Sequence, residues 1–113
     1  MNADLLAFLR ARLDEDEADR WDVHSSDCAT TRDPSFPCDC GYPARMLREV
    51  TADRELLMAY EDRQSWAEDD DPDTMSSNPE WEKGAAAALL TVIRLRAGAA
   101  YSDHPDYDPG WKP

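Results

Sequence analysis

The sequence predicts an all-α fold, a small antiparallel three-helix bundle with a Cys/His loop between its first two helices. Three observations lead to this prediction. Apolar residues recur at helical spacing in three stretches, no stretch alternates apolar and polar residues as a strand does, and proline, glycine and charged runs separate the three stretches. We expect residues 1–113 to form a single small domain, because this length suits one domain.

The first helix is expected over about residues 3–20. Leu5, Leu9 and Leu13 repeat every four residues and form one apolar stripe. Asn2 precedes the stripe and is a residue type that caps helix N-termini. The acidic run at residues 14–17 lies toward the C-terminal end, where the helix dipole is already negative, so we expect fraying there.

The second helix is expected over about residues 43–66. Gly41 and Pro43 mark its start, and Met46, Val50, Leu57 and Tyr60 form its apolar stripe. The charged residues that follow predict an acidic, solvated loop over 67–77.

The third helix has the clearest start, because the segment 77–80 reads Ser-Asn-Pro-Glu, with a capping residue, a first-turn proline and a glutamate three positions after the serine. We expect it over about residues 79–98, ending at Gly98, with an aperiodic tail over 99–113. Its apolar stripe is predicted to face the core, and Val92 is expected to be buried together with Leu57. The stripe comprises Trp81, Ala85, Ala88, Val92, Leu95 and Ala99.

The loop over residues 22–42 contains all three cysteines and one histidine. A structureless loop of this length is rare in a small domain, so something is expected to organise it. His24, Cys28, Cys38 and Cys40 are ligand types that a tetrahedral zinc site uses, and we predict that they bind a structural zinc ion.

Other interpretations of the cysteines stand beside structural zinc. The thiols could be free and reduced, or Cys28 and Cys38 could form a disulfide, which the cytoplasm disfavours. A catalytic zinc would need an open coordination position and a general base, for which the sequence offers only Asp27 or Asp39.

Composition restricts the function classes. The chain has 25 acidic and 12 basic residues, a net charge of −13, which argues against direct binding of nucleic acid or an anionic membrane. Only 16 of the 113 residues are Leu, Ile, Val or Phe, so a large self-sufficient core is not expected. The sequence shows no membrane-spanning run and no export signal, so we expect the protein to be cytoplasmic.

The negative charge is concentrated in two segments, residues 14–27 and 61–73, each with a balance of −6. Such runs are commonly solvated faces, but they also suit electrostatic binding to a basic protein surface. The residues predicted to bind the partner are Asp14, Glu15, Asp16, Glu17, Glu68, Asp69, Asp70 and Asp71. The pattern identifies neither the partner nor the oligomeric state.

We therefore expect a non-enzymatic intracellular protein-interaction module. One alternative is a phage-type or host inhibitor that blocks a nucleic-acid-binding protein by mimicking phosphate charge. Another is a small metal-dependent hydrolase, although the sequence has no phosphate-binding loop, serine elbow or H-E-x-x-H motif.

The tail contains His104-Pro105-Asp106, the tripeptide of J-domain co-chaperones. In those proteins it joins two helices and follows a basic one, whereas here it lies in an acidic terminal tail. We expect instead that it forms a turn, and that Tyr101, Tyr107 and Trp111 fold the tail back onto the helices.

Three stretches resemble an uncharacterised family of small actinobacterial and actinophage proteins, domain of unknown function 6221. They are residues 6–17, the segment 40–50 with its Pro-Ala-Arg-Met-Leu-Arg-Glu-Val helix start, and the tail 101–113 that closes on Trp-Lys-Pro. The resemblance implies no activity. Many members have a cysteine-rich segment just before the tail, where this chain has an alanine-rich helix.

Overall fold

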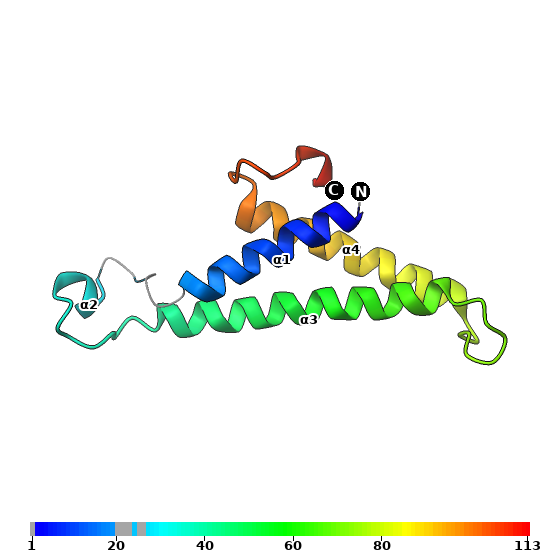
Figure 1. Cartoon of the computed structure of the whole chain (residues 1–113), viewed down its shortest axis with the longest axis horizontal. Coiled ribbons are helices and arrows are strands. Elements are labelled where there is room, and N and C mark those ends of the chain that lie inside the picture. Colours follow the sequence, from blue (N-terminus) through cyan, green and yellow to red (C-terminus); the bar gives the residue numbers. More distant parts are fainter. Residues whose placement is uncertain (1, 20–23, 25–26) are drawn as a thin grey trace. The chain divides into compact units, whose positions relative to one another are not determined.

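The computed structural model describes residues 2–19, 24 and 27–113 (Figure 1). Its helices are α1 (Asn2–Asp19), α2 (Ala29–Arg32), α3 (Tyr42–Glu68) and α4 (Pro79–Tyr101), followed by the 3₁₀ turn η1 (Pro109–Trp111). No strand occurs in the described residues, so the all-α prediction is confirmed. Arg20, at the predicted end of the first helix, and Asp22, in the first acidic segment, lie outside these residues.

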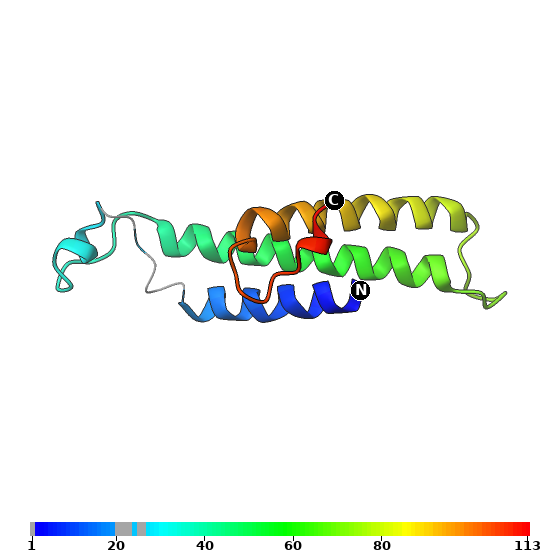
Figure 2. The ribbon, with the colours of Figure 1, turned by 90° about the horizontal axis from the view of Figure 1, so that it is seen from above.

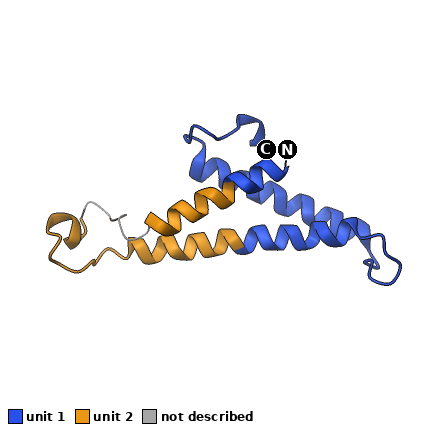
Figure 3. Cartoon of the chain, viewed as in Figure 1, with its two compact units in different colours: residues 1–8, 55–113 blue, residues 9–54 orange. Residues whose placement is uncertain are grey.

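The chain divides into two compact units (Figure 3). Unit 1 comprises Met1–Phe8 and Glu55–Pro113, and unit 2 comprises Leu9–Arg54. The boundary falls inside α1 and inside α3, so each unit contains a part of both helices.

In unit 2, the later part of α1 runs antiparallel to the first part of α3, and the Cys/His loop joins them (Figure 1). Leu9, Leu13 and Val50 are buried, as their stripes predict. The Nη2 atom of Arg54 lies 2.8 Å from Oδ1 of Asp14 and 2.9 Å from Oε2 of Glu17. These contacts place a cation beside the acidic end of α1, which offsets the unfavourable interaction with the helix dipole.

In unit 1, the later part of α3 and α4 form an antiparallel hairpin, which Figure 2 shows from above. The side chain of Asn78 caps α4 by accepting a hydrogen bond from the Trp81 backbone N–H at 3.2 Å. The first turns of α1 and the tail complete the unit. Its buried apolar residues are Leu5, Phe8, Leu57, Tyr60, Ala86, Ile93, Ala97 and Trp111.

The prediction of which face of α4 points inward is wrong. Ile93 is 1% exposed, whereas Val92 is 44% and Leu95 57% exposed, so the stripe assigned to the core faces outward. The inward row is instead Glu82, Ala86, Ile93 and Ala97. Because α4 carries no charge between residues 84 and 93, several of its faces have apolar residues at helical spacing, and periodicity alone does not distinguish them. The burial of Leu57 is confirmed.

Two helix boundaries also differ from the predictions. α4 continues past Gly98 to Tyr101, and Gly98 lies within the helix, where a Cβ atom would be 3.4 Å from the Tyr107 hydroxyl. The glycine therefore lies beside the tail and does not end the helix. Asn2 is the first residue of α1, and its side-chain amide donates to the Tyr60 hydroxyl at 3.5 Å.

Candidate metal centre

The structure brings His24, Cys28, Cys38 and Cys40 together within unit 2. One ligand atom from each residue lies within 4.8 Å of the other three. The Nδ1 atom of His24 is 3.5, 3.2 and 3.7 Å from the sulfurs of Cys28, Cys38 and Cys40, respectively. The Cys38 sulfur is 3.7 Å from that of Cys28 and 3.6 Å from that of Cys40.

These five separations are close to the edges of a metal-centred tetrahedron, and the sixth, between the Cys28 and Cys40 sulfurs, is within 4.8 Å. Ligand distances of about 2.3 Å for Zn–S and about 2.0 Å for Zn–N place two sulfurs about 3.8 Å apart, and a sulfur and a nitrogen about 3.5 Å apart. The five separations given above range from 3.2 to 3.7 Å. The four residues could therefore hold one metal ion at their centre.

The short helix α2, which the sequence analysis missed, positions the first cysteine. Cys28 precedes α2, and its backbone carbonyl accepts the hydrogen bond of the Thr31 N–H, so the helix starts directly from the ligand. The Cys28 side chain is fully buried and makes no capping hydrogen bond to α2. A helix of four residues is too short for the apolar periodicity on which sequence analysis relies.

Hydrogen bonds within the loop hold the segment 36–39 against the start of α2. The carboxylate of Asp39, between the two other cysteines, accepts from the Ala29 backbone N–H at 2.9 Å. The Thr30 hydroxyl donates to the Phe36 carbonyl at 2.8 Å. The hydrogen bond from the Ala29 N–H lowers the pKa of Asp39 below its ordinary value, since this N–H stabilises the charged form of the carboxylate.

A left-handed glycine directs the chain from the last cysteine into α3. Gly41 has a φ of +68°, which side-chain-bearing residues rarely adopt. Its carbonyl accepts from the Arg45 N–H at 3.0 Å, and the Tyr42 N–H points at the Cys40 sulfur at 3.4 Å. Because α3 begins at Tyr42, the position of Cys40 is coupled to the start of the longest helix.

The sulfurs of Cys28 and Cys38 are in different electrostatic environments. Burial raises the pKa of the Cys28 thiol, but the backbone N–H groups of Asp39, Thr30 and Cys40 outweigh this effect, and the pKa lies below its ordinary value. For Cys38 the Cys40 N–H lowers the pKa, but burial and the neighbouring thiols raise it above the ordinary value. Such opposed shifts are expected where several thiols compete for negative charge at one place.

The disulfide and catalytic-zinc interpretations of the cysteines are less compatible with this geometry. None of the three cysteines is in a disulfide, and the 3.7 Å between the Cys28 and Cys38 sulfurs is far longer than the roughly 2.05 Å of a disulfide bond. Asp39, one of two candidate general bases, uses its carboxylate to hold α2.

Part of the predicted acidic surface is used inside the chain. Asp14 and Glu17 pair with Arg54, and Glu15 lies 2.9 Å from Arg12. Asp16 is half-buried, so the first acidic segment does not present all its charge to solvent.

The second acidic segment is ordered by its own carboxylates. Asp69 accepts from the Asp71 N–H and the Thr74 hydroxyl, and Asp71 accepts from the Asp73 N–H. Glu68 accepts from the side-chain amide of Gln64 at 2.6 Å. These hydrogen bonds give the loop a defined backbone. Asp70, within the same loop, is exposed.

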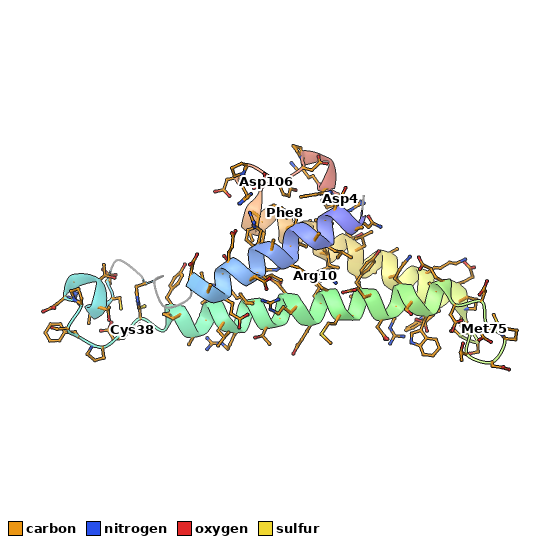
Figure 4. All side chains as sticks on the ribbon, viewed as in Figure 1. Asp4, Phe8, Arg10, Cys38, Met75 and Asp106 are labelled. Carbon is orange, nitrogen blue, oxygen red and sulfur yellow. The ribbon has the colours of Figure 1, made fainter. Side chains whose placement is uncertain are left out.

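The tail folds as predicted. The His104 carbonyl accepts from the Tyr107 N–H at 3.0 Å, which closes a turn over His104-Pro105-Asp106. Figure 4 labels Phe8 on α1 and Asp106 in this turn. The ring of Phe8, which the sequence analysis did not single out, lies 5.0–6.2 Å from four rings of the tail and the end of α4. These are Tyr101, His104, Tyr107 and Trp111.

Comparison with known proteins finds one related family. The model of a family of unknown function, DUF6221, matches residues 2–113. No curated protein and no solved structure matches the chain. No helix in the described part of the chain is both long and apolar enough to cross a lipid bilayer.

Proposed function

The chain belongs to this family of unknown function, and we propose that it is a non-enzymatic intracellular protein-interaction module. In this proposal a structural zinc ion holds the Cys/His loop, and acidic surfaces bind a basic partner protein. The observation that carries the proposal is the convergence of His24, Cys28, Cys38 and Cys40 on one centre.

The ligand set supports a structural zinc site. Three thiolates and one imidazole fill the four positions that zinc prefers, whereas catalytic zinc sites have three protein ligands and an open position. The described residues of the loop that supplies the ligands contain one short helix, so metal binding would contribute directly to the folding of this loop. This arrangement favours a structural role over the metal-dependent hydrolase.

The acidic loop between α3 and α4 supports the binding role. The backbone around Asp69 and Asp71 is held by hydrogen bonds to their own carboxylates, so little order has to be imposed when a partner binds. The loop belongs to a chain with a net charge of −13, which favours rapid encounter with a basic surface. A charge-mimicking inhibitor would use the same loop, with a nucleic-acid-binding protein as its partner.

Elemental analysis of protein purified without an affinity metal tests the zinc site. We expect about one zinc per chain, the stoichiometry of a single four-ligand site, and its loss in Cys38→Ser and in Cys40→Ser. Ser35→Ala is the matched control in the same loop, because Ser35 is exposed and contributes no ligand. A zinc content near zero in the reduced wild-type protein would refute the structural zinc.

A further inference from the structure

The outward face of α4 carries a regular apolar seam. Its residues are Trp81, Ala85, Ala88, Val92, Leu95 and Ala99, hereafter the α4 seam. They alternate steps of four and three residues, which is the a/d spacing of a coiled coil. Trp81 and Leu95 are each 57% exposed and Val92 is 44% exposed. A coiled-coil seam is therefore present that no helix in the described part of unit 1 covers.

One flank of the α4 seam is uncharged and small. It consists of Gly84, Thr91 and Gly98, and a Cβ atom added at Gly84 would meet nothing within 4 Å. Residues 83–102 contain no acidic residue, although the chain has 25, and their charged residues are Lys83, Arg94 and Arg96. An exposed apolar stripe without acidic residues in such an acidic protein is typical of an interface.

We infer that the α4 seam binds a second copy of this chain, with the two α4 helices antiparallel and related by a two-fold axis near residue 90. In this register every layer pairs a large residue with a small one. Trp81 faces Ala99 of the other copy, Leu95 faces its Ala85 and Val92 faces its Ala88. A two-fold interface repeats each of these layers, so all six residues are used on both sides.

Packing and charge both favour the antiparallel orientation. A parallel pair would place Trp81 against Trp81 and Ala88 against Ala88, which overfills one layer and leaves a void in another. In the antiparallel pair, the first turn of one α4, with Glu80, lies within about one helical turn of Arg96 in the other copy. The helix dipoles then also run in opposite directions.

A groove in unit 1 lies where the second copy's tryptophan would fall. It has a volume of about 470 Å³, and its lining includes Leu95, Gly98 and Ala99 from α4 and Tyr107 and Pro109 from the tail. On its own copy, Trp81 is held by the Arg63 guanidinium, 5.4 Å from the ring centroid. An exposed tryptophan opposite an apolar groove is the usual form of an interface hot spot.

Sedimentation equilibrium of the full chain, with zinc and a phosphine reductant, tests the inference. We expect a concentration-dependent doubling of the 12.8 kDa mass. Ala88→Glu should remain at 12.8 kDa over the same range, because it places a carboxylate in two central layers. The matched control is Ala87→Glu, one residue away, exposed and outside the seam, which should dimerise like the wild type. Circular dichroism should show the same helix content for both variants as for the wild type.

Mixing two variants tests the orientation. In the antiparallel register Ala88→Glu of one chain faces Val92→Lys of the other, while the second central layer remains Val against Ala. We therefore expect a heterodimer from two chains that are each monomeric alone. A wild type that stays monomeric at millimolar concentration would overturn the inference, and so would equal effects of Ala87→Glu and Ala88→Glu. Dimerisation without formation of the heterodimer would overturn the antiparallel register.

Discussion

Arg63 on α3 and Glu82 on α4 form an ion pair, with Nη1 of the arginine 3.0 Å from Oε2 of the glutamate. Glu82 is only 8% exposed and belongs to the inward row of α4, so this pair helps to determine which face of the helix turns inward. The same guanidinium lies over the Trp81 ring. One arginine thus orients both the buried and the exposed face at the start of α4.

Arg63→Ala should destabilise the protein by about 1–3 kcal/mol, because it leaves the nearly buried Glu82 carboxylate without its cation, with the Ser76 hydroxyl still donating to it at 3.4 Å. The double variant Arg63→Ala/Glu82→Ala should lose less than the sum of the two single variants. Urea unfolding of all three variants measures this coupling. The control is Lys83→Ala, whose exposed pair with Glu80 should contribute less than about 1 kcal/mol. Additive losses at residues 63 and 82 would contradict the coupling.

Ile93→Ala should lower the free energy of unfolding by about 2–5 kcal/mol, since this side chain is 1% exposed in the core. Val92→Ala, at 44% exposure, should change it by less than about 0.5 kcal/mol. Both are measured at chain concentrations at which the wild type is monomeric, because Val92 belongs to the α4 seam. Equal losses would show that α4 turns a different face inward.

Phe8→Ala should release the tail from α1, because four aromatic rings pack around this phenylalanine. The expected loss is about 3–5 kcal/mol, as for other buried phenylalanines, and the NMR signals of the Tyr107 ring should move toward those of an exposed tyrosine. Phe36→Ala is a matched control, since Phe36 is 56% exposed on the Cys/His loop. An unchanged Tyr107 spectrum in Phe8→Ala would contradict this packing.

Removal of the proposed zinc by a chelator should disorder the Cys/His loop and leave α4 intact, because all four ligands lie in unit 2. Limited proteolysis with mass spectrometry should then find new cleavage between residues 27 and 41. Cys40→Ser should give the same sites without a chelator. Unchanged cleavage after chelation would mean that the loop's own hydrogen bonds are enough to hold it.

Neutralising the acidic loop should weaken partner binding without unfolding the loop. In Asp69→Asn/Asp70→Asn/Asp71→Asn each side chain keeps one oxygen as a hydrogen-bond acceptor while three charges are lost. At residue 69 the second oxygen, which accepts from the Thr74 hydroxyl, is replaced by an amide group that can donate to the same hydroxyl. For a partner captured at low salt, we expect Kd to rise about 3- to 150-fold, on the basis of roughly 0.2–1 kcal/mol for each of three exposed ion pairs.

The control for the acidic loop removes the same charge elsewhere. Asp4→Asn/Glu55→Gln/Asp103→Asn changes three exposed acidic residues outside the loop. If both triple variants weaken binding equally, net charge and not this loop is responsible. If neither does, the loop contributes only to solubility.

Much of the fold and the four ligands of the candidate metal site follow from local sequence chemistry. The Asn78 cap, the four-residue repeat through Leu5, Leu9 and Leu13, and the left-handed Gly41 act over a few residues, so each can be recognised in the sequence. The four metal ligands could be named because zinc binds few side-chain types and all of them lie in one loop.

The inward face of α4, the ion pairs at the end of α1 and the packing of the tail depend on long-range contacts. The inward face of α4 depends on the ion pair of Arg63 with Glu82, 19 residues apart in the chain. The acidic end of α1 depends on the ion pair of Glu17 with Arg54, 37 residues apart. Phe8 became the centre of the tail's packing through residues more than 90 positions away. Periodicity indicates that a helix face is apolar. Which apolar face is buried depends on charged and aromatic side chains that come together only when the helices pack.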